Sequence, residues 1–232
     1  MMSENAEPEL SVKSVAILSL GMIIASLGIS LISSSGLGTT PISSLPFVAS
    51  EVTGLTFGTT TFFFNFALIV LQLLLLRKHF SWLNWLQLPL AFIFSVFLDL
   101  WMFMLGSLPK NDYFLNLCFS MLGNAILGLG IVLEIRSRCI PLSGEAFVLA
   151  LSIVLRKPFS SMKIANDVTL VVLSCVLSYL ALGYLFGVRE GTILSALTVG
   201  LFVRFFAFLC SQFSSRKQSV SDREIPFLSF YN

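Results

Sequence analysis

The sequence predicts an all-α protein that crosses a membrane several times. Hydrophobic residues make up 56% of the 232-residue chain and charged residues only 11%, whereas soluble domains average about 25% charged residues. Several apolar stretches reach the length of about 20 residues that a membrane-spanning helix needs. The second half of the chain also repeats sequence features of the first half at a constant offset. We therefore expect one transmembrane domain, surrounded by the lipid bilayer and built from two related halves.

The repetition consists of short matching motifs in the same order. The first half contains Leu27-Gly28, Pro41-Ile42-Ser43 and Phe47-Val48, and the second contains Leu127-Gly128, Pro141-Leu142-Ser143 and Phe147-Val148. Asn65 follows the first series and Asn166 follows the second. An internal duplication in a membrane protein is typical of transporters and channels.

Six apolar stretches are predicted to span the bilayer. They are Ser14–Ser34, Thr59–Leu76, Asn84–Gly106, Tyr113–Leu133, Ile164–Tyr184 and Gly191–Ser211. The transmembrane domain then covers residues 12–211, with repeat one at 12–106 and repeat two at 113–211. Residues 1–11 and 212–232 form cytoplasmic tails.

Two further apolar runs, Pro41–Gly54 and Pro141–Leu155, are short for a full crossing. If they do not cross, nearly all Lys and Arg residues of the connections face the same side as the N-terminus. If they do cross, Arg77, Lys78, Arg136 and Arg138 lie on the other side, together with Arg189. Because basic residues concentrate on the cytoplasmic side, six crossings with both termini in the cytoplasm fit the sequence better.

Three crossings per half is an odd number, so the second half must be inverted relative to the first. The short runs then approach from opposite faces of the membrane. In the first run, the glycines and proline of 36–41 break the helix, and the extended chain is long enough to reach the bilayer centre. Each short run is therefore either a re-entrant half-helix or an amphipathic helix lying flat on the membrane.

The starts of the two short helices carry the candidate binding residues. These are Thr39, Thr40, Ser43 and Ser44 in the first half, and Ser143, Gly144 and Glu145 in the second. A helix N-terminus presents free N–H groups and a positive dipole end, which suits a carboxylate or another anion. Glu145 could instead accept a cation, a proton or an amine. The alternative is that the hydroxyl groups only cap the helices.

Polar residues inside the predicted spans add further candidates. Asp99 lies within an apolar span, so it serves either transport and proton coupling or a structural bond to backbone or hydroxyl groups. Asn65 and Asn166 occupy matching positions, where they bind either the unwound backbone or the solute. Glu134 ends a span beside Arg136 and is expected to form an ion pair at the interface.

The sequence gives no sign of an enzyme, a metal site or a cofactor. The four cysteines are scattered, and the single histidine, His79, follows two basic residues in a connection. No known catalytic or phosphate-binding motif is present. The net charge of +2 does not indicate nucleic-acid binding.

The segments Gly36-Leu37-Gly38-Thr39-Thr40-Pro41-Ile42 and Phe57-Gly58-Thr59-Thr60 resemble those of the YczE/YitT-type bacterial membrane proteins. The segment Gly191-Thr192-Ile193-Leu194-Ser195 through Gly200 fits the same group, and the resemblance covers roughly Val12 to Cys210. It implies a multi-pass protein of the bacterial inner membrane. The family is largely uncharacterised, so the resemblance assigns no binding residues to this chain.

The leading functional hypothesis is a transporter or channel for a small polar solute, either a carboxylate or a zwitterion, with the site between the two inverted repeats. A chain of this size suits a homo-oligomer. One alternative is the substrate-binding membrane subunit of a larger importer. The other is a membrane scaffold or assembly factor that transports nothing.

Overall fold

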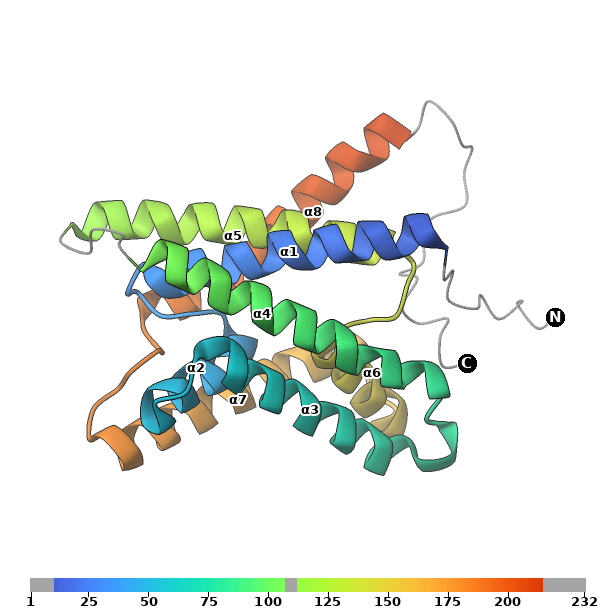
Figure 1. Ribbon diagram of the computed structural model, residues 1–232, viewed down its shortest axis with the longest axis horizontal. Helices are drawn as coiled ribbons and strands as arrows, with labels where there is room; N and C mark the ends of the chain where they lie inside the picture. The colour runs from blue at the N-terminus through green and yellow to red at the C-terminus, as the bar shows by residue number, and fades with distance from the viewer. Residues whose placement is uncertain (1–10, 107–111, 215–232) are drawn as a thin grey trace.

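The computed structural model describes residues 11–106 and 112–214, so most of both predicted tails lies outside the described residues. Within this part, six helices are long and apolar enough to cross a membrane (Figure 1). They are α1 (Val12–Ser34), α3 (Phe57–Leu76), α4 (Gln87–Leu105), α5 (Tyr113–Arg136), α7 (Phe159–Leu182) and α8 (Glu190–Ser214). The prediction of an all-helical chain with six helices of membrane-spanning length is confirmed for the described residues.

Two 13-residue helices, α2 (Pro41–Thr53) and α6 (Ser143–Leu155), occupy the predicted short runs. Each half of the chain therefore has the order long, short, long, long. Two short 3-10 helices, η1 (Arg77–His79) and η2 (Trp82–Leu86), join α3 to α4.

Most helix boundaries differ from the prediction by a few residues, and two of them concern α7 and α8. Helix α7 begins at Phe159 rather than Ile164, directly after Pro158, because an ion pair between Lys163 and Asp167 on successive turns lets polar residues continue the helix. Helix α8 continues to Ser214, into the predicted C-terminal tail.

The centre of the fold is the packing of α1 against α5. Small residues bring the two backbones together, since a Cβ atom added to Gly28 would lie 2.5 Å from the backbone nitrogen of Leu127. A Cβ atom added to Gly130 would lie 2.6 Å from the backbone nitrogen of Ala25. Close approach through glycine is a common way of joining helices in membranes, where the hydrophobic effect does not drive helix association.

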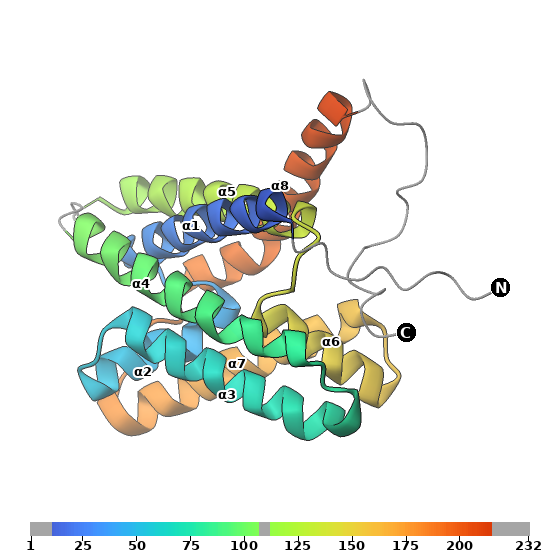
Figure 2. The same ribbon diagram turned by 45° about the vertical axis from the view of Figure 1, so that its right-hand side comes forward.

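The remaining helices are arranged around this pair in two layers (Figures 1 and 2). Helix α4 packs against α1, and α8 packs against α5. In the second layer, α2 contacts α3 and α7, while α6 contacts α7 and α3. One contact differs between the halves: α3 packs closely on α4, whereas α7 touches α8 marginally or not at all. Helix α8 thus diverges from the second layer.

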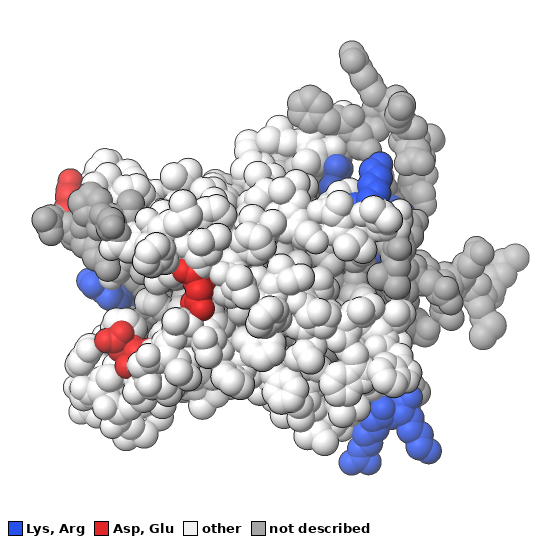
Figure 3. Space-filling view, in the orientation of Figure 1, with Lys and Arg blue, Asp and Glu red and all other residues white. Residues whose placement is uncertain are grey.

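The two ends of the bundle differ in charge. Most Lys and Arg side chains visible in Figure 3 gather at the right, and the acidic side chains visible there lie in the left half. The right end is where α1 begins and where α3, α5 and α6 end (Figure 1). We call it the basic end, and the other end the opposite end.

The two short helices begin side by side. The Cα atom of Gly144 faces the side chain of Ile42 so closely that an added Cβ atom would collide with Ile42 Cδ1. From this meeting point, α2 extends toward the opposite end and α6 toward the basic end (Figure 1). Their first residues, Pro41 and Ser143, are both buried. The helix starts therefore lie within the protein.

Candidate solute-binding cavity

A cavity of about 570 Å³ surrounds the meeting point of α2 and α6. Ligand pockets in proteins range from about 300 to 1,000 Å³, so this space can hold a small organic molecule. Apolar side chains such as Leu18, Ile29, Phe64 and Phe94 form much of its wall. Helices α7 and α8 line another part of the wall through Ile164 and Val199. The cavity thus lies where the second half lacks the close helix contact that α3 and α4 make.

Polar groups converge on this mainly apolar space. The uncharged ones are Thr40, Ser43, Asn65, Ser143 and Ser195. The charged ones are Glu134, Glu145, Lys163 and Asp167. An apolar pocket with a few convergent polar groups is the usual form of a binding site for a small molecule.

Helix α3 holds the start of α6 in place. The Ser143 hydroxyl donates a hydrogen bond to Asn65 Oδ1 at 2.9 Å, and Gln72 Nε2 donates one to the Ser143 carbonyl at 3.1 Å. Gln72 also exchanges two hydrogen bonds of 3.2 Å with Gln87 on α4, and both amides are buried. These bonds fix where the first turn of α6 enters the cavity.

The start of α2 is fixed by hydroxyl groups. Thr39 shares a hydrogen bond of 2.7 Å with Ser33 on α1, and Ser44 shares one of 2.8 Å with Ser174 on α7. Neither Thr39 nor Ser44 lines the cavity. Among the predicted hydroxyl residues, Thr40, Ser43 and Ser143 face the cavity, and Thr39 and Ser44 hold the helix start in position.

Four buried polar atoms of the cavity wall have no hydrogen-bond partner. One of them, Asp167 Oδ1, lies 3.1 Å from Lys163 Nζ in an ion pair. The other three are Thr40 Oγ1, Ser195 Oγ and Glu134 Oε1. Thr40 is 3% exposed and Ser195 is 0% exposed. Buried polar groups in native proteins are nearly always hydrogen-bonded. Because these atoms line one cavity, water or a polar ligand there could satisfy all three.

The connection between α1 and α2 is fastened to the connection between α7 and α8. The backbone N–H of Thr39 donates to the carbonyl of Gly187 at 3.2 Å, and that of Gly191 donates to the carbonyl of Leu37 at 2.8 Å. Arg189 Nη1 also donates to the carbonyl of Gly36 at 3.1 Å. These bonds lie at the opposite end of the bundle, whereas the cavity lining extends to Phe159 near the basic end.

The structure separates Asp99 from the cavity. Asp99 Oδ1 accepts the backbone N–H of Gly58 at 2.6 Å, and Oδ2 accepts the hydroxyl of Thr56 at 2.6 Å. Asp99 thus caps the start of α3, which corresponds to the structural alternative considered for this residue. Asn166 is half-buried and does not line the cavity, unlike Asn65.

Glu134 is the cavity residue that the sequence analysis misplaced. It forms no ion pair with Arg136 among the described residues and instead lines the cavity. The expected ion pair is wrong because residues two apart on a helix point in different directions. Gly21 on α1 makes room for Glu134, since an added Cβ atom would lie 3.0 Å from its Cγ atom.

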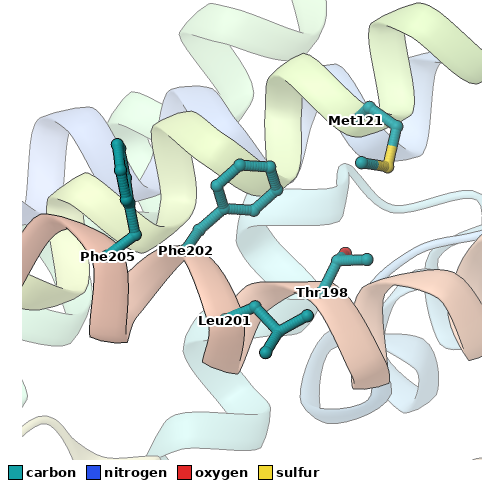
Figure 4. Close-up of a pocket in the computed structure, with 5 residues that line it drawn as sticks. All are labelled: Met121, Thr198, Leu201, Phe202 and Phe205. Carbon is teal, nitrogen blue, oxygen red and sulfur yellow. The ribbon is translucent and has the colours of Figure 1, made fainter.

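A second hollow lies on the outside of the bundle, between α5 and α8. Met121, Thr198, Leu201, Phe202 and Phe205 line it (Figure 4). Figure 4 shows both phenyl rings and the methionine side chain beside the groove between the helices. The only polar side chain is that of Thr198, whose hydroxyl donates to the Leu194 carbonyl at 2.8 Å. This hollow suits lipid chains better than a polar solute.

No three His, Cys, Asp or Glu side chains come close enough to hold a metal ion in the ranges 11–106 and 112–214.

Comparison with known proteins gives the family. Residues 12–208 match the family of unknown function DUF6198. The chain belongs to this family. It is also similar to the uncharacterized protein YyaS of Bacillus subtilis (strain 168), with 34% identity over 125 residues. That alignment covers 51% of this chain and 58% of YyaS, so the chain spans less than two thirds of this relative. No solved structure matches.

These matches support membership of an uncharacterised bacterial family, as the sequence resemblance implied. The matches do not confirm that this family is the YczE/YitT group. The family description and the relative's name state no activity, so any functional conclusion depends on the cavity.

Proposed function

We propose that this protein is a membrane transporter for a small polar solute, which binds in the cavity where α2 and α6 begin. One observation carries the proposal: two helix N-termini and three unpartnered polar atoms meet in a space of about 570 Å³ among helices of membrane-spanning length. Transporters bind solutes near the bilayer centre at such interrupted helices.

The proposal includes an inverted relationship between the halves. Both halves have the same helix order, and the contacts of α2 with α3 and α7 correspond to those of α6 with α7 and α3. The short helices start together and extend toward opposite ends (Figure 1). This arrangement favours two re-entrant half-helices over two helices lying flat on the membrane.

The charge distribution gives the orientation. We assign the basic end to the cytoplasm, because Lys and Arg concentrate on the cytoplasmic side of membrane proteins. Both termini then lie in the cytoplasm, and the protein lies in the inner membrane of a bacterium. On this assignment the cavity lining extends toward the cytoplasmic end at Phe159, and we expect the hydrogen-bonded connections to close the other end.

The test is solute flux in proteoliposomes that contain the purified protein. A panel of amines, amino acids and small carboxylates is screened for uptake, and Gly200→Trp is compared with Leu197→Trp. Gly200 lines the cavity, and a Cβ atom added there meets no atom within 4 Å, so a tryptophan side chain begins in open space beside the cavity. Leu197 is 67% exposed and is not part of the cavity wall.

We expect wild type and Leu197→Trp to transport at the same rate, and Gly200→Trp to transport little. Flux that survives Gly200→Trp would place the solute path elsewhere. No flux of any solute by the folded protein would favour a binding subunit of a larger importer or a scaffold.

A further inference from the structure

The charges on the cavity wall are unequal in number. Glu134, Glu145 and Asp167 are acidic, and Lys163 is the basic residue of the wall. Lys163 Nζ lies 3.1 Å from Asp167 Oδ1, so these two charges compensate each other. Glu134 and Glu145 then have no basic partner within the described cavity wall.

Glu134 is in an unfavourable place for a negative charge. It lies in the last turn of α5, where the negative end of the helix dipole repels a carboxylate. Its Oε1 atom is buried without a hydrogen-bond partner. Burial of an unpaired carboxylate is costly, so the arrangement favours a positively charged partner, and residues 11–106 and 112–214 show no ion pair to Glu134.

Glu145 is the second carboxylate of the described cavity wall without a basic partner there, and like charges that share one cavity repel each other. It occupies the first turn of α6, where the positive end of the helix dipole stabilises a carboxylate. The two residues come from different helices and face one cavity. A cation placed between them would relieve the repulsion and pair with both.

Two further atoms point independently to a ligand in this space. The hydroxyls of Thr40 and Ser195 are more than nine-tenths buried, line the same cavity and have no hydrogen-bond partner. They can bind the polar groups of a solute whose cationic group lies at the glutamates. The wall around them is mostly apolar, with Phe64 and Phe94 among its residues. Such a wall suits an organic cation better than a metal ion, which requires a shell of oxygen ligands.

We propose that the transported solute carries an ammonium group, which binds between Glu134 and Glu145. This inference rests on the proposed transport function and names the chemical class of its solute. The solute would then be an amine or a zwitterion and not the simple carboxylate that the sequence also suggested. In a zwitterion, the carboxylate would lie toward the start of α2, at Thr40.

The test uses the purified full-length protein and two readouts. The first is protection of Glu134 from dicyclohexylcarbodiimide, which modifies carboxyl groups in apolar surroundings, measured by peptide mass spectrometry. The second is the rise in melting temperature on adding ligand. The probes are a series of primary amines from butylamine to 2-phenylethylamine, with 2-phenylethanol and 3-phenylpropionate as neutral and anionic counterparts.

We expect the amines to slow labelling and raise the melting temperature, and the alcohol and the carboxylate to do neither. Glu134→Gln and Glu145→Gln should each weaken amine binding by about tenfold or more, as expected for loss of a charge-assisted hydrogen bond. Glu51→Gln is the control, because Glu51 is exposed on α2 and does not line the cavity. If Glu134→Gln fails to fold, Glu145→Gln alone decides.

Three results would overturn the inference: no effect of any amine, an equal effect of the alcohol, or a preference for the carboxylate. Labelling that changes with pH but is not protected by amines would make the glutamates a proton site instead. Flux of carboxylates without amine protection would retain the transport function and reject the ammonium site. Amine binding without flux would retain the ammonium site and reject the transport function.

Discussion

Asp99 on α4 accepts the backbone N–H of Gly58 at 2.6 Å and so joins α4 to the first turn of α3. The second carboxylate oxygen accepts the hydroxyl of Thr56, the N-cap residue of the same helix. A negative charge is favourable here because α3 presents the positive end of its dipole. An acidic residue inside an apolar span can thus be explained by helix capping alone.

Asp99→Ala should lower stability without changing the solute path. Loss of two hydrogen bonds to a charged group is expected to cost about 1.5–3 kcal/mol or more, and Asp99→Asn should cost less, because its amide oxygen can still accept the N–H of Gly58. Thermal unfolding in detergent measures the loss of stability. Glu51→Ala is the control, because Glu51 is exposed. Normal stability combined with lost flux would instead assign Asp99 to transport.

The sequence sufficed to predict the helices because membrane spans are encoded by length and hydropathy alone. The matching motifs around Pro41 and Pro141 located α2 and α6 almost to the residue. Thr40, Ser43, Ser143 and Glu145 were found as cavity residues because helix starts can be read from local breaks.

The position of Glu134 in the cavity wall could not be predicted from such local breaks. Glu134 reaches the cavity because Gly21 of α1 leaves space beside it and because α8 diverges from α7. Both are tertiary features without a local sequence signal. The roles of Gln72 and Gln87 were not predicted either. Two amide side chains in neighbouring apolar spans are a usable sequence signal, because buried amides form hydrogen bonds across helices in membranes.

The amide pair makes a prediction of its own. Gln72→Leu should destabilise the protein by about 1–3 kcal/mol, because it leaves the buried Gln87 amide and the Ser143 carbonyl without their partner. The double variant Gln72→Leu/Gln87→Leu should recover part of this loss, since no amide remains unpaired on either helix. A double-mutant cycle of melting temperatures measures the coupling. Additive losses would show that the two amides do not interact.

The contact of α1 with α5 should tolerate no added methyl group. In Gly28→Ala, the new Cβ atom would lie 2.5 Å from the Leu127 nitrogen and 2.8 Å from the Gly123 carbonyl oxygen, both rigid backbone atoms. Overpacking of this kind costs about 1–3 kcal/mol or more. Gly200→Ala is the matched control, because its Cβ atom meets nothing within 4 Å. Equal folded yields and melting temperatures for the two variants would contradict the close packing.

The cavity should be reachable from the basic end and closed from the opposite end. A cysteine at Ser143, in a variant whose four native cysteines are replaced, reports this when a membrane-impermeant thiol reagent is added to one side of oriented vesicles. We expect fast labelling from the basic end, because the cavity lining continues to Phe159. Labelling from the opposite end should be slow, because the Gly191 N–H bonds to the Leu37 carbonyl there.

Gly191→Ala should reduce the difference in labelling rate between the two ends. Its Cβ atom would lie 2.6 Å from the Leu37 carbonyl oxygen and 2.9 Å from the Leu37 Cβ atom, so the two connections must separate. Labelling of the cysteine at position 143 from the opposite end should then rise by about tenfold, which corresponds to about 1.4 kcal/mol in favour of the open connection. Gly200→Ala again serves as control, because it lies on the same helix in open space. Unchanged labelling in Gly191→Ala would mean that the fastening of Leu37 to Gly191 does not control access to the cavity.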